Sequence, residues 1–442
     1  MRIRMVVAAT VVWLLALGLA AYWPASDVPA AVSGLTFLSK EDLRGSMQGS
    51  SGIALDLNGD GDEDLVIGAP YAHWGRHGPT GSLLVYLSGP EGFSTPPSAV
   101  LKGDGNLGWS LVTLGSDFAA GGPSGSGEDV SLSGTVTLYH GGAKPQKTVV
   151  LAGENAFDKF GFSLAAGDLN GDGFPDLIVG APFHSPSPAL YQQGAVYIYF
   201  GPEYDPAKAV KIAATSANGG IGFSAAAGDI NGDGVDDLLL QASGKVIGYY
   251  GSRNSFVPNP GGPDVVFTSA DAGFGNSIAL LWDLDGDGFR DVAVGANQAT
   301  IAGVANSGRL FILKGGPGRR TVKADTATDD LLAEIDGEPS GGLFASAILP
   351  IADVDGDGIS DLMVSAILAD GNPWPVTGKI FLFSGSTLTA GATVASARAV
   401  VGEAPNMHLG TFLASVARGD RLAAGAPTEN DNIGRVRLFD LR

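Results

Sequence analysis

Short runs of apolar residues recur along this chain, and each is bounded by glycine, proline or acidic residues. The clearest runs are LVIGAP at 65–70, LIVGAP at 177–182, LLLQAS at 238–243, VAVGAN at 292–297 and LMVSAI at 362–367. Runs of this length with Gly or Pro near their ends are typical of buried strands, and no sustained helical spacing accompanies them. We therefore predict an all-β protein.

Each apolar run belongs to a longer repeated unit, which is clearest between residues 160 and 202. The unit contains a Phe-Gly pair, an apolar strand, an acidic loop, a strand ending in Gly-Ala-Pro, a variable loop and a strand of the type GAVYIYFGP. Two weaker copies, at 107–123 and 409–427, lack the acidic loop. With the five complete copies they make about seven units of roughly sixty residues, a period that indicates a repeat architecture.

Seven such units, each with three or four strands, predict a seven-bladed β-propeller with four-stranded blades around a central channel. The last unit ends after three strands, and LTFLS at 35–39 is a lone strand ahead of the first unit. We therefore expect this N-terminal strand to complete blade seven and close the ring. The predicted propeller domain spans residues 31–442.

The acidic loop has nine residues, as in DLNGDGDED at 56–64, and its positions 1, 3, 5 and 9 are Asp or Asn in all five copies. Oxygen donors at this spacing can surround Ca²⁺, which takes six to eight oxygen ligands at flexible geometry. The glycine at position 6 suits a chain that curls around an ion. The predicted side-chain ligands are Asp56, Asn58, Asp60 and Asp64; Asp168, Asn170, Asp172 and Asp176; Asp229, Asn231, Asp233 and Asp237; Asp283, Asp285, Asp287 and Asp291; and Asp353, Asp355, Asp357 and Asp361.

Two other interpretations of the loop compete with this one. An EF-hand needs an acidic ligand at position 12, where this chain has Ile67, Val179, Leu240, Val294 and Val364. A metal-free turn is the other alternative, because Asn-Gly and Asp-Gly also favour hairpins. Five copies that all keep four oxygen donors favour Ca²⁺, at about five sites.

The order of the Phe-Gly pair, the acidic loop and the Gly-Ala-Pro triplet resembles the FG-GAP repeats of the integrin alpha-subunit head, over residues 35–442. The resemblance implies a seven-bladed propeller with calcium in hairpins on one face and ligand or partner binding on the other. It also implies a fifth ligand at each site, the seventh-position carbonyl of Asp62, Phe174, Val235, Phe289 and Ile359.

Four positions depart from the FG-GAP pattern. The triplet becomes Gln241-Ala242-Ser243, Gly295-Ala296-Asn297 or Ser365-Ala366-Ile367, and Ala345 replaces the glycine of one Phe-Gly pair. We expect altered turn geometry in those units, with their calcium ligands intact.

The N-terminus indicates export. Arg2 and Arg4 precede an apolar stretch from Met5 to Tyr22, and small residues with proline follow. This layout is typical of a secretory signal peptide, although 18 apolar residues also reach the lower margin for a membrane-spanning anchor. We assign residues 1–30 to a signal peptide or N-terminal anchor and expect a secreted, periplasmic or cell-surface protein. Since the chain has no cysteine, it contains neither a disulfide nor a lipid-modified cysteine.

The formal net charge of −20 comes largely from the acidic loops, which bound calcium would partly neutralise. The remaining negative charge favours solubility and disfavours nucleic acids or anionic membranes as partners. We expect an extracellular protein or glycan as partner, and contact with a membrane only if the N-terminal segment is retained.

Catalytic signatures are sparse. The chain has no HExxH, GxSxG or Walker motif, and its one close histidine pair, His73 and His77, lies in a loop rich in Gly and Pro. We therefore expect no catalytic residues and no enzymatic activity. The tripeptide Arg418-Gly419-Asp420 replaces the acidic loop of the seventh unit, where a tight hairpin turn is expected.

Successive loops of a four-stranded blade alternate between faces, so the loops after Gly-Ala-Pro should lie opposite the acidic loops. These variable loops carry Tyr71, Trp74, Arg76 and Trp374, residue types enriched at interface hot spots. We assign them as candidate ligand-binding residues; the alternative is that their rings fold onto their own blades. The predicted function is an exported calcium-binding propeller that acts as a binding or adhesion module for protein or glycan ligands. A carbohydrate-active enzyme or lectin and a purely structural surface protein stay open as alternatives.

Overall fold

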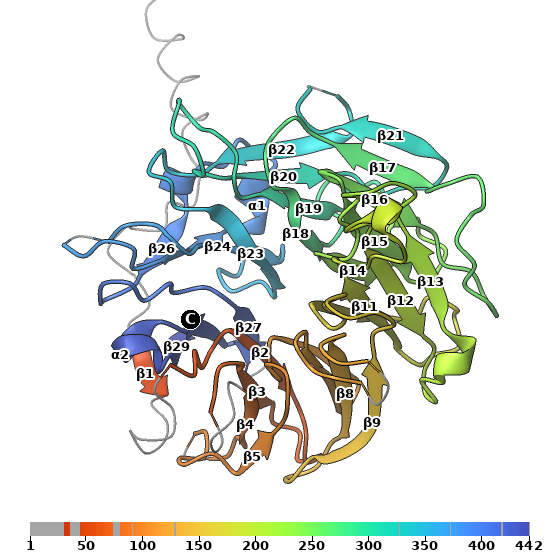
Figure 1. The fold of residues 1–442 in the computed structure, drawn as a ribbon. Coiled ribbons are helices and arrows are strands. Elements are labelled where there is room, and N and C mark those ends of the chain that lie inside the picture. Colours follow the sequence, from red (N-terminus) through yellow and green to blue (C-terminus); the bar gives the residue numbers. More distant parts are fainter. Residues whose placement is uncertain are drawn as a thin grey trace, which may run out of the picture.

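The computed structural model describes residues 31–35, 45–73, 80–90, 92–127, 130–326, 328–371, 373–416 and 419–441. Within these residues the strands form seven sheets arranged in a ring, which confirms the predicted seven-bladed β-propeller (Figure 1). The first strand of each blade contacts the first strands of the neighbouring blades, so these strands surround the central axis.

Each of the first three blades is an antiparallel sheet whose four strands follow one another in sequence. Blade 1 contains β2 (Ser51–Leu55), β3 (Asp64–Ala69), β4 (Ser82–Tyr86) and β5 (Ala99–Lys102). Blade 2 contains β6 (Ser110–Leu114), β7 (Asp117–Gly122), β8 (Thr135–His140) and β9 (Gln146–Ala152). Blade 3 contains β10 (Ser163–Gly167), β11 (Asp176–Ala181), β12 (Ala195–Tyr199) and β13 (Val210–Ala213).

The next three blades repeat this plan with one addition. Blade 4 contains β14 (Ala225–Gly228), β15 (Asp237–Ala242), β16 (Lys245–Tyr249) and β17 (Val265–Thr268). Blade 5 contains β18 (Phe274–Leu280), β19 (Val292–Ala296), β20 (Arg309–Leu313) and β22 (Leu331–Asp336). Blade 6 contains β23 (Phe344–Ile351), β24 (Asp361–Ala366), β25 (Lys379–Phe383) and β26 (Arg398–Val401). The addition is β21 (Arg320–Lys323), which leaves blade 5 and pairs in parallel with β17, giving blade 4 a fifth strand.

Blade 7 is closed by the N-terminal strand, as predicted. It contains β27 (Leu413–Val416), β28 (Arg421–Ala426) and β29 (Arg435–Asp440), and β1 (Ala31–Leu35) pairs antiparallel with β29 as the outer strand. The described part of this strand, Ala31–Leu35, overlaps the predicted span 35–39 only at Leu35, and residues 36–39 lie outside the described residues. An outer strand needs only backbone bonds to one neighbour, so its apolar pattern is a weak guide to its position.

The described helices are single turns within connections and do not form a layer. They are α1 (Gly385–Leu388), α2 (Glu429–Asn432) and 3₁₀ turns at Pro188–Leu190, Pro206–Lys208 and Val394–Ser396.

The hydrophobic core lies between neighbouring blades. Successive side chains of a strand point to opposite faces of its sheet, so the second strand of each blade contributes to two such layers. In β3, Leu65 packs with Val436 of blade 7, whereas Val66 packs with Phe118 of blade 2. A strand covered on both faces is apolar at every position, which explains the continuous apolar runs of the sequence.

The glycine of Gly-Ala-Pro allows two blades to meet. A Cβ atom at Gly68 or Gly121 would collide with the carbonyl oxygen of Gly108 or Gly161, the Phe-Gly-type glycine of the next blade. A serine reinforces the same contact, since Ser51 Oγ donates to the Gly108 carbonyl at 2.7 Å. Where Phe-Gly loses its glycine, Ala345 adopts the left-handed φ of 63° itself, so the turn is retained despite the substitution.

Candidate metal centre

The five acidic loops lie at the same end of their blades. Each one connects the first strand of a blade to the second, as between β2 and β3 in blade 1 and between β18 and β19 in blade 5. Strands in these blades are antiparallel, so the loops that follow the second strands lie at the opposite end. The predicted separation of acidic loops and variable loops onto two faces is therefore confirmed.

The first aspartate of each loop is held by backbone N–H groups of the loop itself. In blade 1, Gly59 N and Gly61 N donate to the two carboxylate oxygens of Asp56, at 2.7 and 2.9 Å. The left-handed φ of 78° at Gly59 and 91° at Gly61 lets the chain curl back toward this residue. The Gly-x-Gly spacing of the sequence therefore has a geometric role, because L side chains rarely adopt this conformation.

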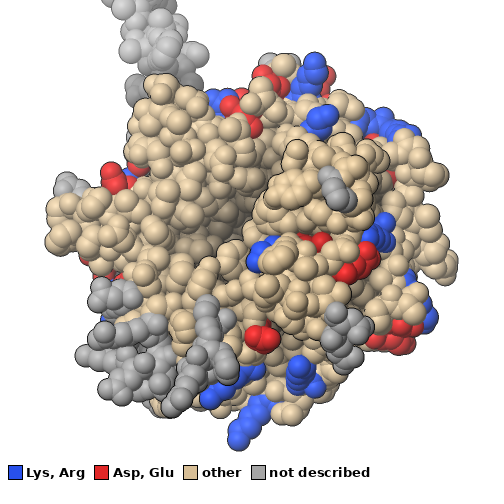
Figure 2. Space-filling model, viewed as in Figure 1, with Lys and Arg blue, Asp and Glu red and all other residues tan. Residues whose placement is uncertain are grey.

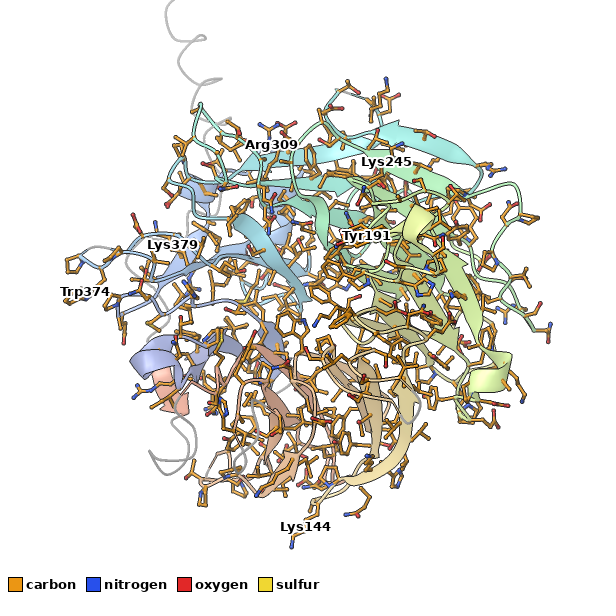
Figure 3. The ribbon with its side chains drawn as sticks, in the orientation of Figure 1. Lys144, Tyr191, Lys245, Arg309, Trp374 and Lys379 are labelled. Carbon is orange, nitrogen blue, oxygen red and sulfur yellow. The ribbon has the colours of Figure 1, made fainter. Side chains whose placement is uncertain are left out.

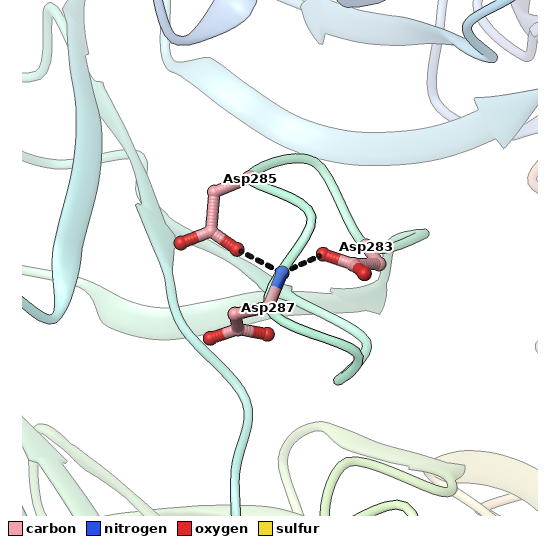
Figure 4. A group of neighbouring side chains, drawn as sticks. All are labelled: Asp283, Asp285 and Asp287. Atoms are coloured by element: carbon pink, nitrogen blue, oxygen red, sulfur yellow. Dashed lines mark hydrogen bonds between the residues drawn. The ribbon is translucent and has the colours of Figure 1, made fainter.

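The side chains at positions 3 and 5 turn toward the same point. In blade 5, Asp287 N donates to Asp285 Oδ1 at 3.2 Å and to Asp283 Oδ1 at 3.1 Å (Figure 4). Phe289 N in turn donates to Asp287 Oδ1 at 3.0 Å. As a result, carboxylate oxygens of Asp283, Asp285 and Asp287 all lie within 4.8 Å of one another.

The ninth position is buried in every loop, in contrast to the exposed first and fifth positions of blade 5. The residues concerned are Asp64, Asp176, Asp237, Asp291 and Asp361, all with no exposed surface. In blade 3, Asp176 Oδ2 accepts from Leu169 N at 2.9 Å and Oδ1 from Gly201 N at 3.0 Å. The same carboxylate thus fastens the loop to the third strand of its blade, a role that the sequence analysis did not predict.

An all-oxygen donor set of this kind fits a hard divalent cation. Blade 6 shows it most completely, because Asp353, Asp355 and the buried Asp361 each bring one oxygen within 4.8 Å of the others. A carboxylate oxygen has two lone pairs, so the backbone bonds leave each ninth-position Asp able to ligate a cation. Calcium would be held here by the predicted ligands and would supply structural cross-linking of the hairpin.

The ninth-position carboxylates predict how stability depends on pH when calcium is absent. Burial raises the pKa of Asp176, Asp237 and Asp291 to about 7, and repulsion from the other loop carboxylates adds to the rise. The folded protein then binds more protons than the unfolded chain between about pH 4 and pH 7. Its stability should therefore be highest in acid and should fall as the pH rises through this window.

The measurement is the melting temperature of calcium-free, dialysed protein at several pH values from 5 to 8. We expect the melting temperature to decrease with pH, and the decrease to vanish when saturating calcium keeps the carboxylates ionised. A melting temperature of calcium-free protein that rises from pH 5 to pH 8 would contradict this prediction.

The two blades that lack an acidic loop replace it by a short hairpin. In blade 2, Asp117 begins β7 at the place of the ninth-position Asp, and Gly141 N still donates to its Oδ1 at 3.1 Å. In blade 7, Gly419 and Asp420 belong to the connection between β27 and β28, and Gly419 has a φ of 91°. This agrees with the predicted hairpin turn, although Arg418 lies outside the described residues.

The structure describes two of the four candidate ligand-binding residues of the variable loops, Tyr71 and Trp374. Tyr71 is half-buried and its ring contacts that of Trp109 in blade 2, with centroids 6.4 Å apart. Trp374 is 47% exposed and lies at the outer edge of the molecule in Figure 3. Trp74 and Arg76 lie outside the described residues, as does His77 of the histidine pair.

The structure reveals instead an arc of aromatic residues that the sequence analysis missed. Trp109, Phe162 and Phe223 each follow the Phe-Gly-type glycine just before the first strand of blades 2, 3 and 4. Ring centroids are 5.5 Å apart between Trp109 and Phe162, and again between Phe162 and Phe223. Alignment of the repeats by this glycine would have found the arc. Figure 2 shows one face of the ring, on which charged residues lie both at the rim and near the middle.

Three stretches of the chain, at 48–86, 160–199 and 274–313, match the FG-GAP repeat family. Phosphatidylinositol-glycan-specific phospholipase D of Bos taurus is 24% identical over 432 residues, which cover 84% of this chain and 50% of that protein. The Homo sapiens protein of the same name is 25% identical and covers 76% of this chain and 45% of its own length. Integrin alpha-7 of Homo sapiens is 37% identical over 159 residues, 34% of this chain and 13% of the integrin. The chain therefore spans about half the length of the phospholipases and a smaller share of the integrin.

The expectation that the protein is not an enzyme is contradicted by these relatives. The two phospholipases are enzymes by name, and the similarity to them covers most of the chain. The lack of short catalytic motifs is no ground for that expectation, because catalytic residues contributed by separate parts of a fold need not form any contiguous signature.

Among the described residues, no helix combines the length and apolar character needed to cross a membrane.

Proposed function

We propose that this chain, which belongs to the FG-GAP repeat family, is an exported propeller that is stabilised by Ca²⁺ and presents a ligand-binding face opposite its calcium loops. The observation that carries the proposal is the repetition of one oxygen-lined loop in five blades at the same end of the ring. Calcium fits this donor set better than a transition metal, because Ca²⁺ prefers carboxylate and carbonyl oxygens at flexible geometry.

Export is supported by the signal-like residues 1–30, which lie outside the described residues. It also agrees with the calcium chemistry. Calcium loops of extracellular modules bind with dissociation constants of about 10⁻⁴ to 10⁻³ M and stay filled only where free calcium is high.

The ligand-binding face is supported by the aromatic arc and by the loops around it. Phe223 is 37% exposed and lies just before β14, an inner strand that is mostly half-buried. Phe183, from the loop after Gly-Ala-Pro in blade 3, lies 5.5 Å from it between ring centroids. Phenylalanine is among the residue types enriched in the cores of protein interfaces. We assign a protein or glycan ligand to this surface.

The test compares two phenylalanines on opposite faces. Phe223→Ala should weaken binding to arrayed glycans or matrix proteins by about 2 kcal/mol or more, the loss typical of a hot spot. Phe174→Ala removes an equally large ring that is 49% exposed on the calcium loop of blade 3, and it should leave binding unchanged. Loss of binding in the Phe174 variant alone would assign the ligand to the calcium face and overturn this part of the proposal.

A second candidate function is favoured by the alignment with phosphatidylinositol-glycan-specific phospholipase D over 84% of the chain. In this alternative, the propeller takes part in cleavage of a phosphatidylinositol-glycan and the aromatic arc contacts the glycan. The same two variants, assayed for release of a phosphatidylinositol-glycan-anchored protein from vesicles, separate this function from simple binding.

A further inference from the structure

One strand position in each blade lies opposite the ninth position of the acidic loop, or opposite the residue that replaces it. The antiparallel register places His140 opposite Asp117 in blade 2 and Asp440 opposite Arg421 in blade 7. In blade 5, where Val292 pairs with Leu313, the next residue outward is Lys314.

In the two blades without an acidic loop, this position forms a pair between a basic and an acidic side chain. His140 Nδ1 lies 3.0 Å from Asp117 Oδ1, and Arg421 Nε lies 2.9 Å from Asp440 Oδ1. Where the loop is absent, a side chain of the protein therefore stands beside the carboxylate. In blade 2 the basic residue, His140, stands at this position, whereas in blade 7 the position is held by Asp440 and the basic residue is Arg421.

Blade 5 is unusual because it has both an acidic loop and a basic residue at this position. Lys314 Nζ lies 2.5 Å from Asp285 Oδ2, in a loop that is exposed as a whole although the two side chains are only 27% and 17% exposed. The corresponding residues of blades 1, 3 and 4 are Leu87, Phe200 and Tyr250, and that of blade 6 is Ser384.

The partner of Lys314 is the residue that gives the blade 5 loop its extra charge. Blades 1, 3 and 4 have Asn at loop position 3, whereas blade 5 has Asp285. In blade 1, Asn58 Oδ1 accepts from Asp60 N while its Nδ2 group points to the Asp60 carboxylate. Asp285 Oδ1 accepts from Asp287 N in the same way, and its second oxygen meets Lys314. The Asp285–Lys314 ion pair of blade 5 thus stands where blades 1, 3 and 4 have the neutral side-chain amide of an asparagine.

We propose that Lys314 is a built-in counter-ion of the blade 5 loop, which lowers the calcium affinity of this loop and preserves its shape when calcium is scarce. The inference rests on the proposed calcium binding. Calcium affinity follows the charge of the ligand set, and an ammonium group beside one ligand both cancels a negative charge and repels the entering cation. Blade 6, which has Asp355 at position 3 and a serine in place of Lys314, keeps the full charge and should bind calcium more tightly.

A tryptophan makes the blade 5 loop observable by itself. Trp282 immediately precedes Asp283, the first ligand of this loop, so Tb³⁺ bound there should be excited through the indole. The other two tryptophans among the described residues, Trp109 and Trp374, belong to loops at the opposite end of the blades. Trp282→Phe should remove the sensitised Tb³⁺ signal, which assigns that signal to blade 5.

The experiment compares Lys314→Met with Lys379→Met in the full-length protein. Lys379 makes a similar ion pair, at 2.5 Å from Glu338 Oε2, but it begins β25 at the end away from the calcium loops. Both variants therefore lose one positive charge. For Lys314→Met we expect about tenfold tighter Tb³⁺ binding at the Trp282-sensitised site and about tenfold tighter calcium competition, the order of effect of one nearby charge in a partly solvated site. We also expect a lower melting temperature than that of Lys379→Met in calcium-free buffer.

The outcomes separate this inference from the calcium proposal. If the parent protein binds calcium and the Trp282-sensitised Tb³⁺ titration of Lys314→Met superimposes on that of the parent, the proposed role of Lys314 is overturned and the calcium proposal stands. A parent protein with no calcium-competed signal at any site would overturn calcium binding, and the inference with it. Equal tightening in Lys379→Met would show a general effect of net charge and would also overturn the inference.

Discussion

Removal of residues 1–35 should convert the propeller into a protein that aggregates or melts at lower temperature. β1 provides the outer strand of blade 7, with four residues in register with β29. Its loss removes several backbone hydrogen bonds worth about 1 kcal/mol each and should lower the melting temperature by about 5 °C. It also leaves β29 as an unpaired edge, which is a template for association with other chains.

Truncation to residue 31 is the matched control, because it removes residues 1–30 and keeps β1. Its melting temperature and its elution in size-exclusion chromatography should equal those of the full-length protein. If both truncated proteins are equally stable and monomeric, closure by β1 does not hold the ring together.

The fold and the closure of the ring could be predicted from the sequence because every blade repeats the same pattern of buried and exposed positions. A second strand covered on both faces must be apolar at every position, as LIVGAP shows, and seven repeats of that pattern define the ring. The parallel pairing of β21 with β17 was not predictable, since Arg320–Lys323 has no pattern that specifies a partner in a neighbouring blade.

The acidic loops were located correctly, but the environment of their side chains was not foreseen. Spacing alone marks Asp176 and Asp172 as equivalent donors, whereas the structure buries Asp176 and exposes Asp172. Likewise, Lys314 is 29 residues away from Asp285 in sequence and reaches it only because β20 returns beside β19. Such contacts depend on the register of paired strands, which cannot be predicted from the spacing of residues within a motif.

The aromatic residues illustrate the same limit. Trp374 was singled out for its residue type, yet it stands apart at the edge of the molecule, whereas Trp109 and Phe162 form a contact between blades. The prediction of function from the sequence was less successful than the prediction of the fold. The expectation of a protein without enzymatic activity rested on missing motifs and is contradicted by the phospholipase relatives.

Calcium removal should produce the largest loss of stability. A ligand that binds only the folded protein stabilises it by about 2.7 kcal/mol per site at a hundredfold excess over its dissociation constant. Several such sites together match the whole net stability of a typical domain, roughly 5–15 kcal/mol. Without the cation, each loop also gathers carboxylates whose mutual repulsion opposes folding.

Single substitutions should reveal the contribution of one loop. Asp287→Asn weakens the blade 5 site, so it should lower the melting temperature in calcium and have little effect without it. Asp205→Asn makes the same change of charge outside the loops, at the residue that caps the turn Pro206–Lys208. This control should show no difference between the two conditions beyond that of the parent protein.

The most direct test of the calcium-stabilised propeller is a pair of thermal melting curves, recorded by circular dichroism at neutral pH, of the same protein in millimolar calcium and in excess chelator. The structure predicts a cooperative transition that shifts to much lower temperature in chelator and returns when calcium is restored. Two curves that superimpose would contradict calcium binding at the acidic loops.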